Sequence, residues 1–347
     1  MGTENSPDNG FYQGYSCYTG FMTSTSLTPL NTDVGLSTAT NYIPTLFVSA
    51  GKRAQYKFIE FFTANIRNAN TRKAYFRAVE KFCQWCDLRN LELAHVTPVH
   101  VALYIEELGQ EVSIPTVKQH LSAISTLFDH LVTGQVITMN PARSVKAPKY
   151  HVAKGKTPVL TAEETRRLLD SIDTSKIAGL RDKAIIGIMV FSFARVGAVL
   201  HMNVDDYFMK GKRSWIRLHE KGGKYHEMPL NHKAEQYLDE YIEVSGITDE
   251  KKKPLFRTLT RKRTLSPNRL EQRECLDMVK RRARKVKLSE TICNHTFRGT
   301  GITVFLENGG SIEDAQRMAN HADVKTTKLY DRRSDNVTVE MVELVRI

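Results

Sequence analysis

The chain has 347 residues, of which 41% are hydrophobic and 25% are charged. This length and composition suffice for two domains with hydrophobic cores, and they exclude a chain that is disordered throughout. The formal net charge of +12 favours a polyanionic partner, either nucleic acid or an anionic membrane surface, although a merely basic protein would show the same excess. No apolar run is long enough to span a bilayer and no signal peptide is recognisable, so we expect nucleic acid and no membrane.

The first 50 residues differ in composition from the rest of the chain. They contain no Lys or Arg, they are rich in Ser, Thr, Asn, Gly and Tyr, and they show no helical periodicity. We predict that residues 1–50 form a flexible N-terminal arm. An ordered arm that docks on a partner is the alternative.

Residues 51–145 are predicted to form an entirely helical domain. Thr71 is a candidate N-cap, and the apolar residues that follow it recur at helical spacing, at Tyr75, Val79, Phe82 and Trp85. Two more helices are predicted over Thr97–Leu108 and Pro115–Leu131.

The five cysteines are odd in number and scattered, which indicates a reducing compartment and no disulfide framework. Cys83 and Cys86 have the CxxC spacing of some metal and redox sites. They fall within an apolar helical run, however, and the sequence contains no second pair. Buried helix positions are therefore expected for both.

Basic residues in and after the helical domain are candidates for contacts with DNA phosphates. They are Arg72, Lys73, Arg77, Lys118, Arg143 and Lys146. Basic helical faces often serve only solubility, which is the alternative for each of them. Pro141 and Pro148 mark a helix stop, and residues 146–156 are predicted to form a basic linker. Such a linker could follow a DNA backbone while two domains grip opposite faces of the duplex.

Residues 157–347 are predicted to form a second, mixed domain. Thr161 and Glu164 have the spacing of a capping box that opens a helix. An apolar helix is expected over Asp182–Phe193.

The rest of this domain combines a hairpin with several helices. Two short strands are predicted over Ser214–Leu218 and Tyr225–Leu230, joined by a glycine-containing turn. A long basic helix is expected to begin near Pro267. Further helices are predicted around residues 298–307, 311–320, 324–330 and 337–345.

Motifs of nucleotide and metal chemistry are absent from the sequence. It contains no Walker P-loop, no GxGxxG after a strand, no HExxH and no paired CxxC. The carboxylates near the candidate site are too few for a two-metal nuclease. We therefore expect no cofactor, no metal ion and no nucleotide hydrolysis.

The residues that indicate chemistry are a set of cations and one tyrosine. Arg195 is expected at the end of the apolar helix, where an arginine is costly unless it binds something, and guanidinium groups match phosphate oxygens in bidentate fashion. His295 and Arg298 are three residues apart at the entry to a helix, so both can face one ligand. Lys221 lies at the glycine-containing turn. Taken singly, each has an ordinary structural explanation.

Taken in order, these residues resemble the Arg–Lys–His-x-x-Arg–His–Tyr signature of the tyrosine recombinases. The positions that carry it are Arg195, Lys221, His295, Arg298, His321 and Tyr330. The segment from Arg217 to Leu230 resembles the hairpin of that family, and the last histidine precedes the tyrosine by nine residues, as in Xer-like members. The resemblance covers residues 157–347 well, residues 52–145 more loosely, and residues 1–50 not at all.

Three positions depart from the pattern of the family. Ala198 stands where many members have an acid, Gly299 follows Arg298 where histidine is common, and Asn320 precedes His321 where glycine is common. These departures put the tuning of the site in doubt more than its chemistry.

The resemblance implies a mainly α fold with a small antiparallel β-sheet, in which a SAM-like core-binding domain and a catalytic domain form a C-shaped clamp on DNA. The implied partners are double-stranded DNA recombination sites, a homotetramer held through a C-terminal exchange helix, and accessory DNA-bending or regulatory proteins. Such a protein would act in the cytoplasm at the nucleoid, or in the host-cell cytoplasm if a phage or mobile element encodes it.

The implied reaction is that of a site-specific recombinase. Tyr330 would attack a DNA phosphodiester and form a covalent 3′-phosphotyrosine with a free 5′-hydroxyl, and strand exchange would pass through a Holliday junction. The alternatives are a type IB topoisomerase, which shares this chemistry but exchanges no strands, and a DNA-binding protein without catalytic activity.

The resemblance also implies roles for the cations. Arg195 and Arg298 would hold the phosphate oxygens, and Lys221 would protonate the leaving oxygen. Lys224 is the alternative acid and a further candidate for DNA contact. Which of the two signature histidines moves the tyrosine proton stays open.

Overall fold

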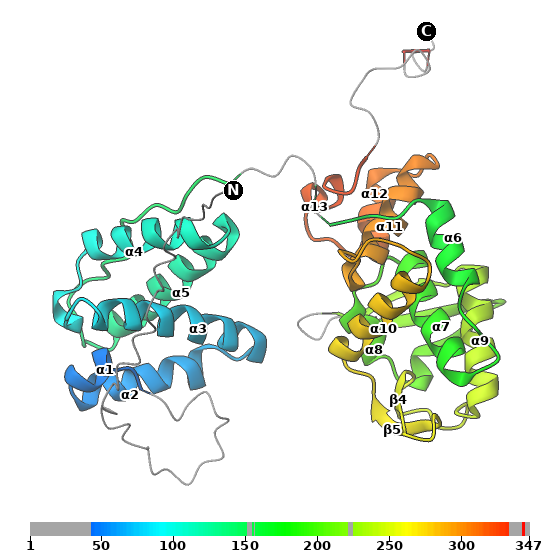
Figure 1. Ribbon diagram of the computed structural model, residues 1–347, viewed down its shortest axis with the longest axis horizontal. Helices are drawn as coiled ribbons and strands as arrows, with labels where there is room; N and C mark the ends of the chain where they lie inside the picture. Colours follow the sequence, from blue (N-terminus) through cyan, green and yellow to red (C-terminus); the bar gives the residue numbers. More distant parts are fainter. Residues whose placement is uncertain (1–42, 151–154, 156, 221–224, 333–341, 344–347) are drawn as a thin grey trace, which may run out of the picture. The chain divides into compact units, whose positions relative to one another are not determined.

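The computed structural model describes residues 43–150, 155, 157–220, 225–332 and 342–343 (Figure 1). The chain divides into two compact units, Met1–His151 and Val152–Ile347, and each encloses a hydrophobic core of its own. Both units consist mainly of helices, and in the described chain all strands lie in the second unit, in two small antiparallel sheets. The predicted fold class is therefore confirmed. In the described ranges, every helix is too short or too polar to cross a membrane.

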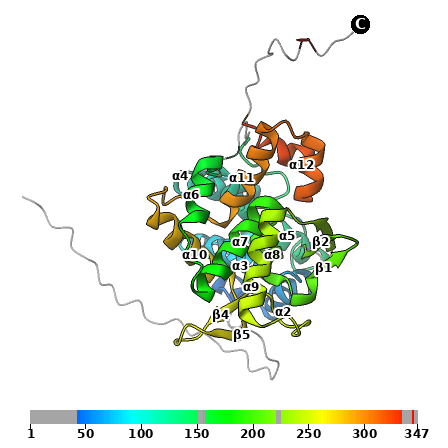
Figure 2. The same ribbon diagram turned by 90° about the vertical axis from the view of Figure 1, so that its right-hand side faces the viewer.

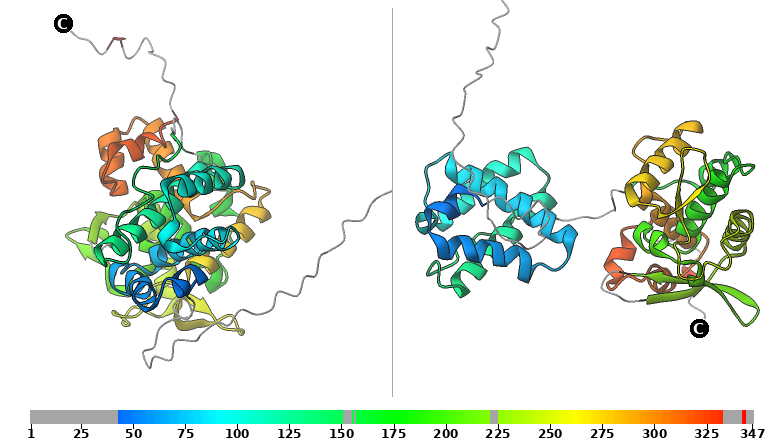
Figure 3. Two further views of the ribbon diagram at one scale, coloured as in Figure 1. Left: turned by 90° about the vertical axis from the view of Figure 1, so that its left-hand side faces the viewer. Right: turned by 90° about the horizontal axis from the view of Figure 1, so that it is seen from below.

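The first unit is built of helices alone. Its elements are α1 (Thr45–Ser49), α2 (Lys52–Glu60), a π-helical turn η1 (Phe61–Asn65), α3 (Ala69–Asp87), a 3-10 turn η2 (Leu93–His95), α4 (Pro98–Glu111) and α5 (Ile114–Thr133). Helices α2, α3 and α4 all pack against α5, and Figure 3 shows them in blue to cyan. The two helices predicted around residues 97–108 and 115–131 are confirmed as α4 and α5.

Helix α3 starts at a different residue from the one predicted. Its N-cap is Asn68, whose Oδ1 accepts the backbone N–H groups of Asn70 at 3.0 Å and Thr71 at 3.1 Å. Thr71 as N-cap is wrong. Asparagine caps a helix at least as well as threonine. Both side chains are suitable, and the cap is the one farther from the first apolar residue.

Helix α1 lies inside the segment that was predicted to be a flexible arm. Leu46 and Phe47 are 2% and 1% exposed, and the Phe47 ring packs on Phe58 of α2 with centroids 4.6 Å apart. The arm prediction is wrong for residues 43–50, because these apolar side chains are buried against the helical unit. Residues 1–42 lie outside the described residues.

The interior of the first unit is apolar and rich in aromatic rings. The Phe82 ring lies 6.3 Å from that of Trp85 and 5.1 Å from that of Tyr104. Cys83 and Cys86 are buried in the same helix as free thiols, which confirms the prediction for both. Burial raises the pKa of Cys86 to about 12, so this thiol is protonated and unreactive at neutral pH.

The predicted linker is only partly described. Residues 146–150 have no helix or strand, and Ala147 packs against the first core. Of residues 151–156, only Gly155 is described.

In the second unit, the other elements pack around one buried helix, α7. Its helices are α6 (Ala162–Asp170), α7 (Ile177–Phe191), α8 (Val196–His201), α9 (His232–Ser245), α10 (Gln272–Lys285), α11 (Asn294–Glu307), α12 (Ile312–Ala319) and α13 (Val324–Lys328), with a 3-10 turn η3 (Val204–Asp206). Its strands are β1 (Tyr207–Lys210), β2 (Arg213–His219), β3 (Tyr225–Pro229), β4 (Arg257–Leu259) and β5 (Leu265–Arg269). Helix α7 is mostly apolar in sequence, and most of its side chains are buried because α9 and α11 pack against it (Figure 1).

Strands β1, β2 and β3 form an antiparallel sheet in that order, with β1 and β2 labelled in Figure 2. In the register of the sheet, Trp215 of β2 faces Phe208 on β1 and Pro229 on β3. Alternate residues of β2 are buried, namely Ser214, Ile216 and Leu218, so one face of the sheet covers the core. The two predicted strands are confirmed as β2 and β3.

Two helix boundaries in this unit differ from the predicted ones. Pro267 lies in β5, a strand with a single neighbour, where the missing N–H of proline is tolerated; α10 begins instead at Gln272. Helix α7 ends at Phe191, and Phe193 adopts a φ of 54° in the turn that follows. Arg195 is therefore the N-cap residue of α8, and its placement at the end of the apolar helix is wrong.

Helix α6 begins as the sequence predicts. Thr161 Oγ1 accepts the N–H of Glu164 at 3.1 Å, and the Glu164 carboxylate accepts the N–H of Thr161 at 2.9 Å. This reciprocal capping box depends only on neighbours in sequence. The helix predicted at 337–345 lies outside the described residues, apart from residues 342–343.

A buried charge cluster joins α7 to α10. Asp182 is 0% exposed, and its carboxylate accepts two hydrogen bonds from Arg181, at 2.9 and 3.2 Å, and two from Arg282, at 2.7 and 3.1 Å. Arg181 also donates to the Arg257 carbonyl at 2.7 Å. The one carboxylate of the cluster is thus hydrogen-bonded on both oxygens and paired with two cations, as a buried charge requires.

Candidate active site

Helix α11 carries two residues of the predicted set. His295 and Arg298 lie in its first two turns, three residues apart. Arg298 is 1% exposed and donates to the carbonyl of Phe193 through Nη1 and to that of Ala319 through Nη2, the latter at 2.6 Å. Its buried Nε has no hydrogen-bond partner in the described chain. Burial and the nearby Arg195 lower the pKa of Arg298 to about 10, so it stays charged at pH 7.

Tyr330 follows α13 and is 6% exposed. Its backbone is fixed at both polar groups: the N–H donates to the Thr327 carbonyl at 2.9 Å, and the carbonyl accepts from Thr303 Oγ1 at 2.9 Å. Its Oη lies 2.6 Å from His295 Nε2. Burial raises the pKa of Tyr330 despite the opposing charges of Arg298 and Arg195, so the phenol needs a base to become a nucleophile.

His321 follows α12, where Asn320 closes the helix with a φ of 48°. The His321 ring is parallel to that of Tyr330, at an interplanar angle of 7° and a centroid distance of 6.2 Å. Its Nδ1 lies 2.9 Å from Thr327 Oγ1. Burial and the cations Arg298 and Arg195 lower the pKa of His321 to about 3, so this imidazole is neutral at pH 7.

Arg195 reaches the site from the start of α8. Its side chain is 43% exposed, and Nη1 donates to the Glu220 carboxylate at 2.7 Å. His295 is also exposed on one side, and burial of the rest together with Arg298 and Arg195 lowers its pKa. The site therefore combines two guanidinium groups, two imidazoles that favour the neutral state, and one phenol. Such a donor set suits an anion with a reactive centre, for which a phosphodiester is the natural candidate.

The structure brings together most of the predicted signature. His295 contacts the phenol oxygen of Tyr330, the His321 ring lies parallel to the phenol ring, and the charges of Arg195 and Arg298 act on it. Lys221 and Lys224 lie outside the described residues. In the described ranges, no group of three or more His, Cys, Asp or Glu side chains is arranged to hold a metal ion.

The candidate DNA contacts of the first unit fall into two classes. The exposed ones are Lys73, Arg77, Lys118, Arg143 and Lys146, of which Arg143 lies 3.7 Å from Asp129. Arg72 differs, because its guanidinium donates twice to the Ile66 carbonyl, at 2.8 and 3.0 Å. These bonds use Nε and Nη2 of Arg72 to close the chain before α3, so Arg72 is a weaker candidate for DNA contact than the exposed residues.

Several site residues were not predicted from the sequence. Glu220 and Thr327 bond to Arg195 and His321, and no signal in the sequence says which partners they would meet. Gly299 bears on one departure from the family pattern: a Cβ there would lie 3.2 Å from the Tyr330 ring, a close contact to which the ring would have to adjust. Asn320 explains another, because asparagine is the residue that best replaces glycine at positive φ.

The segment around Tyr330 is also bonded to the start of the second unit. The N–H of Gly155 donates to the Leu329 carbonyl at 3.0 Å, and Arg332 Nη2 donates to the Gly155 carbonyl at 2.7 Å. A Cβ on Gly155 would lie 2.7 Å from the Leu329 carbonyl oxygen. The chain just before residue 157 thus bonds on both sides of the tyrosine.

Comparison with known proteins places this geometry in a family. Residues 158–336 match the phage integrase family, and residues 56–137 match its N-terminal SAM-like domain. Tyrosine recombinase XerD of Staphylococcus aureus is 26% identical over 269 residues, which are 76% of this chain and 88% of the relative.

Solved structures show the same fold. XerH bound to its difH substrate aligns with a TM-score of 0.61 at 19% identity, over 85% of this chain and 84% of the other. A lambda integrase tetramer bound to a Holliday junction aligns with a TM-score of 0.60 at 17% identity, over 82% and 78% of the two chains. Neither the topoisomerase nor the non-catalytic alternative is favoured by these matches. The chain belongs to the phage integrase family, the site-specific tyrosine recombinases that exchange DNA strands.

Proposed function

We propose that Tyr330 is the nucleophile of this recombinase. The observation that carries the proposal is the 2.6 Å contact between Tyr330 Oη and His295 Nε2, beside a buried arginine that has a donor to spare. Oη attacks phosphorus, a 3′-phosphotyrosyl bond forms, and the bond from phosphorus to the 5′-oxygen breaks. A 5′-hydroxyl from another strand reverses the step. The phosphodiester energy is retained in the covalent intermediate, so rejoining needs no nucleotide.

The two arginines hold the phosphate. Arg298 is anchored through both terminal nitrogens, so its unpartnered Nε is the donor that a phosphate oxygen would satisfy. An unpaired buried donor is costly in a folded protein and is expected where a ligand completes it. Arg195 supplies a second, more exposed fork. Donors of this kind act mainly on the charge that develops in the transition state.

The tyrosine proton goes to His295. It is the imidazole within hydrogen-bond distance of Oη, and its lowered pKa keeps it neutral and able to accept a proton at pH 7. His321 stacks on the phenol ring and is held by Thr327, so its role is to orient the ring and bind the phosphate. Lys221 protonates the leaving 5′-oxygen, with Lys224 as the alternative acid; that assignment rests on the sequence alone.

Both units contact duplex DNA at a recombination site. In the first unit the contacts come from exposed cations, namely Lys73, Arg77, Lys118, Arg143 and Lys146. The first unit and the catalytic unit bind opposite faces of the duplex as a clamp. XerH was solved on its substrate with a fold similar to this one, which supports the proposal.

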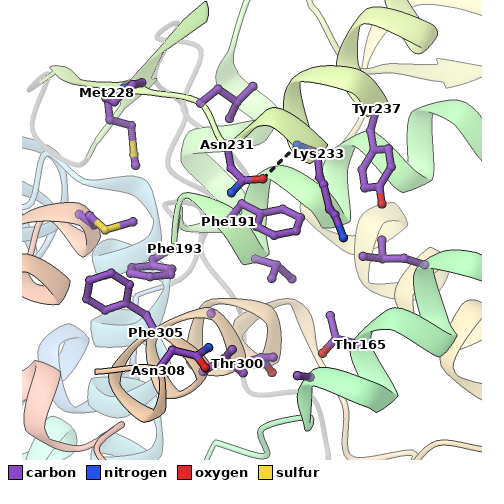
Figure 4. Close-up of a pocket in the computed structure, with 18 of the residues that line it drawn as sticks. Thr165, Phe191, Phe193, Met228, Asn231, Lys233, Tyr237, Thr300, Phe305 and Asn308 are labelled. Carbon is purple, nitrogen blue, oxygen red and sulfur yellow. Dashed lines mark hydrogen bonds between the residues drawn. The ribbon is translucent and has the colours of Figure 1, made fainter. Parts of the chain in front are cut away.

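The active assembly is a tetramer joined through residues 337–347. A groove of about 880 Å³ lies between α6, α7, α9, α11 and β3 (Figure 4). Phe191, Phe193, Phe305 and Tyr237 line it, and its cations are Arg166, Arg213, Lys233 and Arg317. The C-terminal segment has the complementary pattern, with apolar residues interrupted by Glu340 and Glu343. We assign the groove to that segment of a second copy. The lambda integrase tetramer supports the assembly.

The proposal is tested by covalent capture. The full chain is incubated in EDTA with a library of nicked duplexes randomised around the nick, and DNA that stays on the protein under denaturing conditions is sequenced. Wild type should capture a defined sequence, whereas Tyr330→Phe should bind that DNA with unchanged affinity and capture none. Capture by Tyr330→Phe would show that the nucleophile is another residue. Capture that requires magnesium would overturn the mechanism.

A further inference from the structure

One carboxylate in the described chain is bonded to Arg195. It belongs to Glu220, whose side chain is 7% exposed, and it accepts from Arg195 Nη1 at 2.7 Å. The two residues are 25 positions apart, one after the end of β2 and the other at the start of α8. Carboxylates are almost never this deeply buried unless they are paired. This pair is thus a more specific feature than the exposed ion pairs on the surface.

Other ion pairs fix the strand from which Glu220 projects. His219 Nε2 lies 2.6 Å from the Asp206 carboxylate, and Arg217 lies 3.7 Å from Asp206 and 2.8 Å from Glu227. Asp206 belongs to η3, which follows α8 closely in sequence. The end of β2 is therefore attached to the same stretch of chain that begins with Arg195. Glu220 extends from an anchored base.

The contact leaves most of the Arg195 guanidinium available. A guanidinium group has five N–H donors in a rigid plane, and Glu220 engages Nη1 only. The donors on Nε and Nη2 can still face two phosphate oxygens. A half-exposed arginine otherwise samples many rotamers, which it must give up on binding. The bond to Glu220 removes part of that freedom before DNA arrives.

We propose that Glu220 is a positioning residue that holds Arg195 in the orientation that receives the scissile phosphate. The inference rests on the proposed function, since it takes Arg195 as a phosphate ligand. Helix α8 has no acid of its own, and Ala198 within it is 3% exposed and has no polar atom in its side chain. Glu220 directly precedes Lys221, so one strand end links both proposed cations.

A carboxylate beside a phosphate site has two opposing effects. Its charge weakens the attraction for DNA, whereas its hydrogen bond orders a cation that acts in the transition state. The charge also opposes the negative charge that develops in the transition state, but we expect the ordering of Arg195 to dominate the cleavage rate. Removing the carboxylate should therefore leave DNA binding equal or tighter and make cleavage slower. A purely repulsive charge would give the opposite change in rate.

The test compares Glu220→Ala and Glu220→Gln in the full chain, on the duplex captured by wild type. Glu220→Ala should form the covalent complex at least about tenfold more slowly, with an unchanged melting temperature and no loss of DNA affinity. Glu220→Gln keeps an oxygen acceptor and should recover most of the rate. Glu243→Gln, which removes the same charge at an exposed position of α9, should cleave like wild type. The double variant Arg195→Ala/Glu220→Ala should be no slower than Arg195→Ala.

A second readout needs no DNA. The ¹⁵Nε resonance of Arg195 should show an ordered side chain in wild type and in Glu220→Gln, and a mobile one in Glu220→Ala. The inference is overturned if Glu220→Ala cleaves as fast as wild type or faster, if its effect adds to that of Arg195→Ala, or if both Glu220 variants melt early. If wild type captures no duplex, the proposed function fails, and the resonance still decides whether Glu220 orders Arg195.

Discussion

The two units of this protein differ in the polarity of their buried side chains. In the described part of the first unit, every buried side chain is apolar, aromatic or a thiol. All the buried polar and charged residues of the described chain lie in the second unit, among them Asp182, Arg298 and His321. The DNA contacts that we propose for the first unit therefore lie on its surface, whereas the site that we propose in the second unit includes buried groups. Stability and function should separate easily in the first unit and poorly in the second.

The second unit itself contains two kinds of buried charge. The carboxylate of Asp182 is matched on all sides by Arg181 and Arg282. Arg298, by contrast, is held by two backbone carbonyls and no carboxylate, and its Nε is unpartnered. A buried carboxylate that is paired on all sides indicates a structural role. A buried arginine with an unpartnered donor indicates a site that binds an anion. The substitutions below test this distinction and the contrast between the two units.

The largest effect on stability is expected at Asp182. Asp182→Asn removes the one carboxylate of the cluster and leaves Arg181 and Arg282 without a counter-charge, which should destabilise the second unit by about 3–5 kcal/mol. Urea unfolding followed by a probe in that unit measures the loss. Asp277→Asn is the matched control, since its carboxylate is exposed and lies 3.5 Å from Arg273; it should cost less than about 1 kcal/mol. Equal stability of the two variants would show that the cluster contributes nothing specific.

Arg298 should control the reaction more than the fold. Arg298→Lys keeps the charge, but an ammonium group cannot hold two carbonyls and a phosphate in a plane, so single-turnover cleavage should fall by about 10²–10³-fold. Some loss of melting temperature should accompany it, because two backbone bonds are lost. Arg284→Lys, at an exposed ion pair with Glu290, should cleave at the wild-type rate. Undiminished cleavage by Arg298→Lys would remove this residue from the phosphate site.

His321 should make stability depend on pH. Its pKa is about 3 in the folded protein, far below the ordinary value near 6.5, so the unfolded chain binds more protons between these limits. The contribution of His321 is complete above about pH 6.5 and is lost as the pH falls, by up to about 1.4 kcal/mol per pH unit. His321→Gln should flatten the stability profile between pH 7 and pH 5. His95→Gln, at a side chain that is 72% exposed, should leave the profile as steep as in wild type. Equal slopes for the two variants would show that His321 is not the source of the pH dependence.

The smallest effects are expected on the surface of the first unit. Lys118→Ala should change stability by less than about 0.5 kcal/mol and lower the salt dependence of DNA binding by about one phosphate contact. Arg72→Ala should do the reverse, costing about 1 kcal/mol in stability through its bonds to the Ile66 carbonyl while leaving the salt dependence unchanged. If Lys118→Ala also leaves the salt dependence unchanged, DNA does not lie on that face of α5.

Features that depend on neighbours in sequence were predictable, and those set by distant chain segments were not. The Thr161 capping box and the strands β2 and β3 follow from local patterns, and the structure contains them. The Asn68 cap was missed because two suitable side chains compete within four residues. The turn at Phe193 was missed because a bulky residue at positive φ is stable only when the surrounding fold holds it.

The same division applies to the site. The order of its cations and its tyrosine along the chain led to the reacting groups that we propose, because each chemistry demands its own residue types. The positions of their supports did not follow from that order. Glu220 meets Arg195, and the carbonyls of Phe193 and Ala319 meet Arg298, only because the helices and the sheet place them there. Backbone acceptors have no signature in sequence at all.

The bonds between Gly155 and the Tyr330 segment bear on how such enzymes can be rebuilt. A chimera that exchanges the helical unit for another DNA-binding module needs a fusion junction, and the sequence alone would put it anywhere up to residue 156. Gly155 bonds to Leu329 and Arg332, which lie on either side of the tyrosine. A junction between residues 150 and 155 would therefore keep the bonds from Gly155 to the Tyr330 segment. A junction after residue 155 would transfer the catalytic unit without them.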